Sequence, residues 1–125
     1  MQKPEFKFRH LGINVNGSSA AQGIVETFGE VFGQEIIPLP KSTLVGREIE
    51  IMHGGGPGAN GHICFTVSSI PEALEYLSGR GWQADFKTAQ YAEDGRIKIV
   101  YLEKALSGFA IHLFEERGVF VKGEK

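Results

Sequence analysis

Side chains able to bind a metal ion recur at matched places along the chain. His10 and His62 each occupy the third position of an octet with strand-like alternation. Glu50 and His112 each lie between two apolar residues, in Ile-Glu-Ile and Ile-His-Leu, near the end of a half of the chain. A unit that carries one such residue near each end and occurs twice supplies four ligands, so the repeat predicts a metal site.

Three imidazoles and one carboxylate favour particular metals. The set suits a divalent transition metal such as zinc, nickel, iron(II), cobalt or manganese. Calcium and magnesium require more oxygen ligands. With a divalent ion, the site would carry a net charge of about +1, attract an anionic oxygen substrate and polarise a carbonyl or stabilise an enediolate. We therefore expect a small-molecule anionic substrate.

Each of these residues also has an ordinary structural interpretation. A single strand histidine is most often a hydrogen-bonded or surface residue, and a single strand glutamate is most often solvated. The matched positions favour metal binding by at least three of the four. Glu48 is the rival of Glu50, His53 is either a fifth ligand or a loop residue, and Cys64 is interpreted as a buried thiol rather than a nucleophile.

The composition limits the classes of partner. The 125 residues fit a single domain, and the net charge of -2 shows no basic surplus for nucleic acid or an anionic membrane. No apolar stretch approaches the roughly 18 residues of a spanning helix, and the N-terminus lacks a signal-peptide core. The single cysteine excludes an intrachain disulfide. We expect a cytoplasmic protein.

The periodicity predicts an α+β domain over 1–125 with two βαβββ modules, one over about 6–53 and the other over about 60–116. Ser18 or Ser19 is expected to cap the first helix and Gly33 to end it. The glycine-rich run 53–58 is expected to be a flexible hinge between the modules. Residues 119–125 are expected to form a tail. The predicted strands are 6–15, 35–39, 42–45, 47–52, 61–68, 82–88, 95–102 and 109–115, and the predicted helices are 20–32 and 71–77.

At these motifs the chain resembles the vicinal oxygen chelate superfamily, which includes glyoxalase I, bleomycin resistance proteins, methylmalonyl-CoA epimerase and extradiol dioxygenases. The resemblance runs from about Phe8 to Glu115 and rests on the order of four short motifs. It implies a curved mixed sheet around a central divalent metal and, in many relatives, a homodimer. The implied metal ligands are His10, Glu50, His62 and His112.

The segments 9–14, 60–63 and 108–113 are also similar to the small domain appended to some 2-dehydro-3-deoxyphosphogluconate aldolases. This resemblance implies a sugar acid or its phosphate as the substrate. It also implies a second possibility, a non-catalytic metal-binding, ligand-binding or regulatory module.

His112 stands where glyoxalase I and the epimerase carry a glutamate that moves the proton. The resemblance therefore makes glutathione-dependent activity doubtful and leaves Glu50 as the candidate general base. The favoured hypothesis is a metal-dependent lyase or isomerase. An extradiol dioxygenase is a weaker one, since four protein ligands leave few open positions on iron. Arg96 and Lys98 share a strand face, where they would hold a substrate anion or form a solvated edge.

Overall fold

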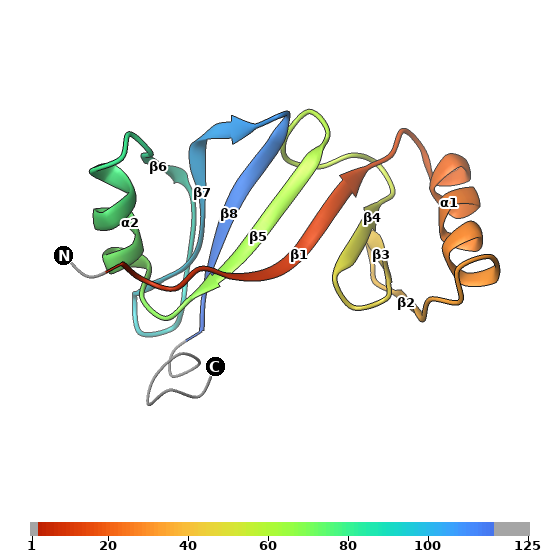
Figure 1. The fold of residues 1–125 in the computed structure, drawn as a ribbon, viewed down its shortest axis with the longest axis horizontal. Coiled ribbons are helices and arrows are strands. Elements are labelled where there is room, and N and C mark those ends of the chain that lie inside the picture. The colour runs from red at the N-terminus through yellow and green to blue at the C-terminus, as the bar shows by residue number, and fades with distance from the viewer. Residues whose placement is uncertain (1–2, 117–125) are drawn as a thin grey trace. The chain divides into compact units, whose positions relative to one another are not determined.

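A computed structural model describes residues 3–116 of the chain. The elements follow the order βαβββ twice, as the periodicity predicts, and the class is α+β (Figure 1). The predicted tail, 119–125, lies outside the described residues. The elements are β1 (Lys7–Asn14), α1 (Ser18–Glu30), β2 (Ile36–Pro38), β3 (Ser42–Val45), β4 (Ile49–Met52), β5 (Gly61–Val67), α2 (Ile70–Ser78), β6 (Ala84–Tyr91), β7 (Ile97–Leu106) and β8 (Phe109–Glu115).

Spatial contacts divide the chain into two compact units. We call 10–63 with 107–109 the site unit, and the remaining described residues the α2 unit. β1, β5 and β8 contribute residues to both units. Because this division follows spatial contacts, the module boundaries drawn from the repeat stay a prediction.

In the site unit, the strands lie in the order β2-β3-β4-β1, with the start of β5 beside β1. β1 and β4 are parallel, whereas β2, β3 and β4 form an antiparallel meander. β2 is an edge strand, as its Pro38 predicts, because proline cannot donate to a neighbouring strand. The core contains Val15, Ala21, Val45 and Ile51, with Ile24, Val25 and Phe28 of α1 packed against it.

The ends of α1 differ from the prediction. The residue that caps the helix is Gly17, with φ 98°, and no side chain donates or accepts a capping hydrogen bond. The helix ends with Val31 as its C-cap, two residues before Gly33. Val31 and Phe32, which the predicted range 20–32 placed inside the helix, lie beyond Glu30 and are exposed, at 70% and 63%.

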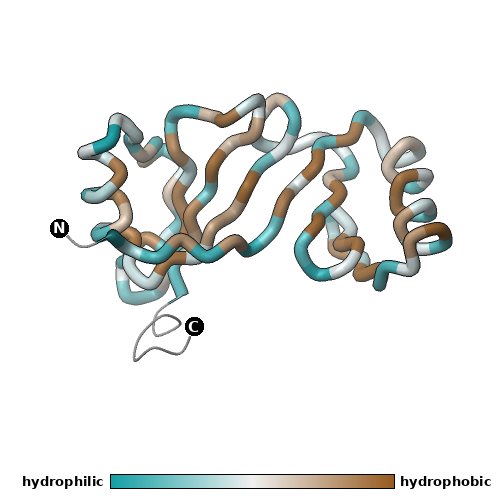
Figure 2. Tube along the Cα trace, in the orientation of Figure 1, coloured by the Kyte–Doolittle hydropathy of each residue, from teal (hydrophilic) through white to brown (hydrophobic). Residues whose placement is uncertain are grey.

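In the α2 unit, the strands lie in the order β5-β8-β7-β6. β5 and β8 consist largely of apolar residues (Figure 2), and along β8 buried residues, Ile111, Leu113 and Glu115, alternate with partly buried ones. Ser69 is the N-cap of α2, where its hydroxyl accepts from the Glu72 backbone N–H at 3.3 Å, and Pro71 lies in the first turn, where proline is tolerated. Ile70 and Ala73 of α2 are fully buried. Within residues 3–116, neither helix is long and apolar enough to cross a membrane.

Candidate metal centre

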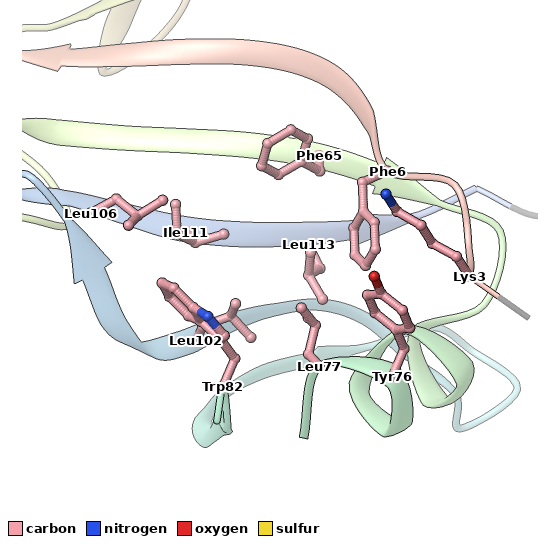
Figure 3. Close-up of a pocket in the computed structure, with 10 residues that line it drawn as sticks. All are labelled: Lys3, Phe6, Phe65, Tyr76, Leu77, Trp82, Leu102, Leu106, Ile111 and Leu113. Atoms are coloured by element: carbon pink, nitrogen blue, oxygen red, sulfur yellow. The ribbon is translucent and has the colours of Figure 1, made fainter. Parts of the chain in front are cut away.

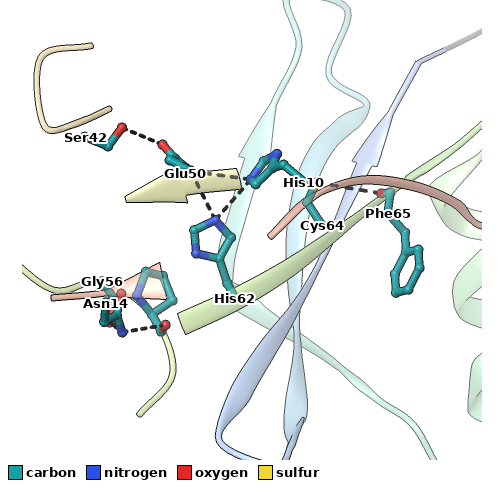
Figure 4. Close-up of polar contacts among 9 residues, drawn as sticks. His10, Asn14, Ser42, Glu50, Gly56, His62, Cys64 and Phe65 are labelled. Atoms are coloured by element: carbon teal, nitrogen blue, oxygen red, sulfur yellow. Dashed lines mark hydrogen bonds and ion pairs between the residues drawn. The ribbon is translucent and has the colours of Figure 1, made fainter. Parts of the chain in front are cut away.

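The side chains of His10, Glu50 and His62 converge in the site unit. The two Nε2 atoms lie 3.1 Å apart, and Glu50 Oε1 lies 3.5 Å from that of His10 and 3.4 Å from that of His62. Figure 4 shows the three side chains meeting from β1, β4 and β5. We call these three atoms the donor triangle. His62 is 5% exposed at its side chain, whereas His10 and Glu50 are 20% and 17% exposed.

A glycine makes this convergence possible. Gly12 pairs with Glu50 in the parallel β1–β4 ladder and lies on the same face of β1 as His10. A Cβ at Gly12 would lie 2.1 Å from His62 Cε1. The imidazole therefore occupies the space that a side chain would fill, and it crosses β1 to reach Glu50. β5 also approaches closely here, since a Cβ at Gly61 would lie 1.9 Å from the Gly12 carbonyl oxygen.

The second oxygen of Glu50 has its own partner. Ser42, which is 3% exposed, donates from Oγ to Glu50 Oε2 at 2.6 Å. This hydrogen bond fixes the carboxylate and leaves Oε1 directed at the two histidines (Figure 4). Such support of a ligand by a neighbouring polar group is typical of metal sites.

The pKa of Glu50 is lowered from its ordinary value to about 2. The largest cause is the hydrogen bond with His62, the Ser42 hydroxyl and the positive charge on the imidazoles act in the same direction, and partial burial opposes them. Glu50 is therefore ionised throughout the neutral range. An ionised carboxylate is the form that binds a metal, but one of such low basicity is a weak proton acceptor.

Two kinds of occupant satisfy such a triangle. In the first case, protons shared between the imidazoles and the carboxylate would join the three side chains in a hydrogen-bond network. A transition metal would also fit, because bonds of about 2.0–2.2 Å in a tetrahedral arrangement place ligand atoms roughly 3.3–3.6 Å apart. The observed separations of 3.4 and 3.5 Å lie within this range, and that of 3.1 Å lies just below it. The residues present fit a divalent transition metal.

His112 belongs to the α2 unit, where it lies on β8 with its ring stacked on Tyr101 at 4.5 Å between centroids. Stacking limits rotation of the imidazole, which is the kind of restraint a metal ligand needs. Its place as the fourth ligand stays a prediction.

The other candidate residues named from the sequence lie in surroundings different from those of the donor triangle. Glu48 is exposed in the turn before β4, so it does not join the donor triangle. His53 Nε2 lies 2.7 Å from the Oγ1 of Thr43, a hydroxyl on β3. Cys64 is a buried thiol, 1% exposed. Arg96 forms ion pairs with Asp94, at 2.9 Å, and with Glu115, so it does not share an unpaired anion-binding edge with Lys98.

Two residues of the site, Ser42 and Gly12, were not predicted from the sequence. Ser42 gives no signal by itself, because a serine at the start of a strand is common and its partner is eight residues away. Gly12 does give a signal, since a glycine inside a strand often marks a close approach of another group. Gly12 lies on the same face of β1 as His10, and the group that approaches it is the imidazole of His62.

Comparisons with known proteins support the fold. No protein-family model matches the sequence, and no curated protein matches it significantly. Among solved structures, a hypothetical protein, BH1468, from Bacillus halodurans C-125 matches with a TM-score of 0.60 and 18% identity, over 90% of this chain and 96% of that one. Methylmalonyl-CoA epimerase from Mycobacterium tuberculosis matches with a TM-score of 0.60 and 16% identity, over 87% of each chain.

Homoprotocatechuate 2,3-dioxygenase from B. fuscum matches with a TM-score of 0.59 and 14% identity, over 92% of this chain but 34% of its own. These neighbours have the vicinal oxygen chelate fold, and the present chain has the same fold. At such low identity the likeness extends to the fold alone.

Proposed function

We propose that the chain is a metal-dependent lyase or isomerase that acts on a small oxygenated acid derived from a sugar. The observation that carries the proposal is the donor triangle, in which two imidazole nitrogens and one carboxylate oxygen lie within 3.5 Å of one another. His112 is proposed as the fourth ligand. The related folds of an epimerase and a dioxygenase support a metal-dependent chemistry at a coarse level.

When bound, a divalent transition metal would supply Lewis-acid stabilisation of negative charge on substrate oxygens. The side chains of the triangle hold it, and the Ser42 hydroxyl fixes the orientation of Glu50. Glu50 is the carboxylate of the triangle and is therefore the proposed proton acceptor. We further propose a cytoplasmic homodimer, on the basis of the single cysteine and the family resemblance.

One observation favours a second candidate function, a non-catalytic metal-binding or regulatory module. The pKa of Glu50, lowered to about 2, suits a permanent ligand better than a base, since efficient bases have a pKa near the working pH. The two candidates agree on the metal site and differ in whether Glu50 moves a proton.

The first experiment measures metal content by elemental analysis of the purified protein. We expect about one divalent transition metal for each pair of modules. His62→Ala should lose most of it, because the imidazole supplies one corner of the triangle. His53→Ala is the matched control, since His53 lies in the same unit but bonds to Thr43. Full occupancy in His62→Ala would refute the site.

The second experiment separates the two functions. Deuterium incorporation into candidate sugar acids is followed by NMR for the wild type and for Glu50→Gln, each loaded with metal. If Glu50 is the base, exchange should fall by roughly 10²–10⁴-fold in the variant, because glutamine retains an oxygen ligand but cannot accept a proton. Exchange that is unchanged in Glu50→Gln would exclude Glu50 as the base. Absence of exchange in the metal-loaded wild type would favour the binding module.

A further inference from the structure

A pocket of about 310 Å³ opens in the α2 unit, between α2 and the apolar side of β5, β7 and β8 (Figure 3). Ile111 and Leu113 of β8 line it. Because side chains alternate along a strand, His112 between them faces the other side. This aromatic pocket is therefore separate from any site to which His112 contributes.

The lining of the aromatic pocket is apolar apart from its rim. Phe6, Phe65 and Trp82 contribute aromatic rings, and leucines from α2 and β7 contribute aliphatic surface. Protein interiors are normally close-packed, and an apolar hollow of this size is suited to an apolar ligand. A water molecule takes up about 30 Å³ in the liquid, so at that volume for each non-hydrogen atom the space accommodates roughly ten of them.

The rim carries positive charge. Lys3, Phe6 and Tyr76 gather at one end of the pocket in Figure 3, and Lys3 makes no ion pair within residues 3–116. Lys3 is the one charged residue among those that line the pocket. Its ammonium group favours an anionic head group over a cationic one, and the Tyr76 hydroxyl can donate a hydrogen bond to a carboxylate.

We propose that the aromatic pocket binds an apolar monocarboxylate, an aliphatic or aromatic acid of roughly ten non-hydrogen atoms. The apolar body fills the space between α2 and the strands, and the carboxylate pairs with the Lys3 ammonium. The site is independent of the donor triangle, whose residues belong to the site unit.

The chain has one tryptophan, and it lines this pocket, so its fluorescence reports occupancy directly. Octanoate, octylammonium and octan-1-ol are each titrated into the full chain. Each titration is done once in the presence of a chelator and once after metal loading. We expect a saturable change with octanoate, binding at least about tenfold tighter than octylammonium, and the same result with and without metal. Failure of the metal site would therefore leave this result intact.

Two variants test the assignment. Lys3→Gln should reduce the preference for octanoate to less than about threefold, whereas Lys87→Gln, an exposed lysine on β6, should leave it unchanged. Leu77→Phe should weaken all three ligands by filling the space, with circular dichroism confirming the fold. The proposal is overturned if octanoate gives no saturable change up to about 10 mM, well above a Kd of 1 mM. A fluorescence change that follows protein concentration, with dimers in sedimentation, also overturns it, because a second copy would then cover the pocket.

Discussion

Substitution of Gly12 by alanine is the most direct test of how the donor triangle is built. The new Cβ would lie 2.1 Å from His62 Cε1 and 2.7 Å from its Nε2, whereas ordinary contact begins at 3.4 Å. The imidazole would therefore have to retreat by about 1.3 Å, the difference between 3.4 Å and 2.1 Å. Metal sites tolerate changes of about ±0.2 Å in ligand distance, so His62 would no longer reach the metal.

We expect Gly12→Ala to weaken metal binding by at least about 100-fold, which corresponds to about 2.7 kcal/mol. Competition with a chromogenic chelator gives the affinity, and the visible spectrum of a cobalt-loaded sample reports the number of ligands. Gly23→Ala is the matched control, because a Cβ at that position of α1 meets nothing within 4 Å. Its metal affinity should equal that of the wild type.

A double-mutant cycle distinguishes the displaced imidazole from general unfolding. If the clash with His62 is the cause, Gly12→Ala should destabilise the metal-free wild type but cost little in a His62→Ala background, where the ring is absent. A metal affinity within about twofold of wild type in correctly folded Gly12→Ala protein would refute the steric argument.

The remaining predictions concern the surroundings of Glu50 and the proposed fourth ligand. Ser42→Ala should weaken metal binding by roughly 10-fold, because it frees the carboxylate oxygen that the hydroxyl holds at 2.6 Å; a chelator titration measures this. Because the folded-state pKa of Glu50 is lowered from 4.5 to about 2, its contribution to the stability of the metal-free protein is present above pH 4.5 and is lost as the pH falls toward 2. Urea unfolding should show a loss of up to about 3 kcal/mol over that window, and Glu50→Gln should lack this component. His112→Ala should lower metal affinity without unfolding the protein, and unchanged affinity would remove His112 from the ligand set. Isomerisation of the glutathione hemithioacetal should be negligible, because a histidine stands at position 112; a spectrophotometric assay that detects rapid lactoylglutathione formation would contradict this.

The repeat in the sequence predicted the order of the elements of the fold. Three of the four matched residues, His10, Glu50 and His62, lie together in the site unit, and their role as metal ligands stays a prediction. The bounds of β3 and β8 agree with the predicted ranges, since both strands end at polar or glycine-containing turns. The start of α1 was predicted wrongly, because Ser18 and Ser19 resemble caps but the chain turns at Gly17 without a side-chain bond.

What could not be predicted depends on contacts between strands distant in the chain. The bond from Ser42 to Glu50 depends on the register of β3 against β4, which places Ser42 opposite Met52 and Leu44 opposite Glu50. The space above Gly12 depends on how closely β5 approaches β1. Neither distance is encoded in the periodicity of a single segment.

The run His53–Gly58 was expected to be a flexible hinge, and a single amide changes that interpretation. Asn14 Nδ2 lies 3.2, 3.3 and 2.9 Å from the carbonyl oxygens of Gly56, Pro57 and Gly58. An amide has two hydrogens, so at least one of them is shared between two of these carbonyls. These contacts hold the segment that joins the halves of the repeat against the end of β1, where Asn14 lies two residues beyond Gly12. The length of this segment therefore bears on the fold, and we expect an insertion here to separate the Asn14 amide from these carbonyls.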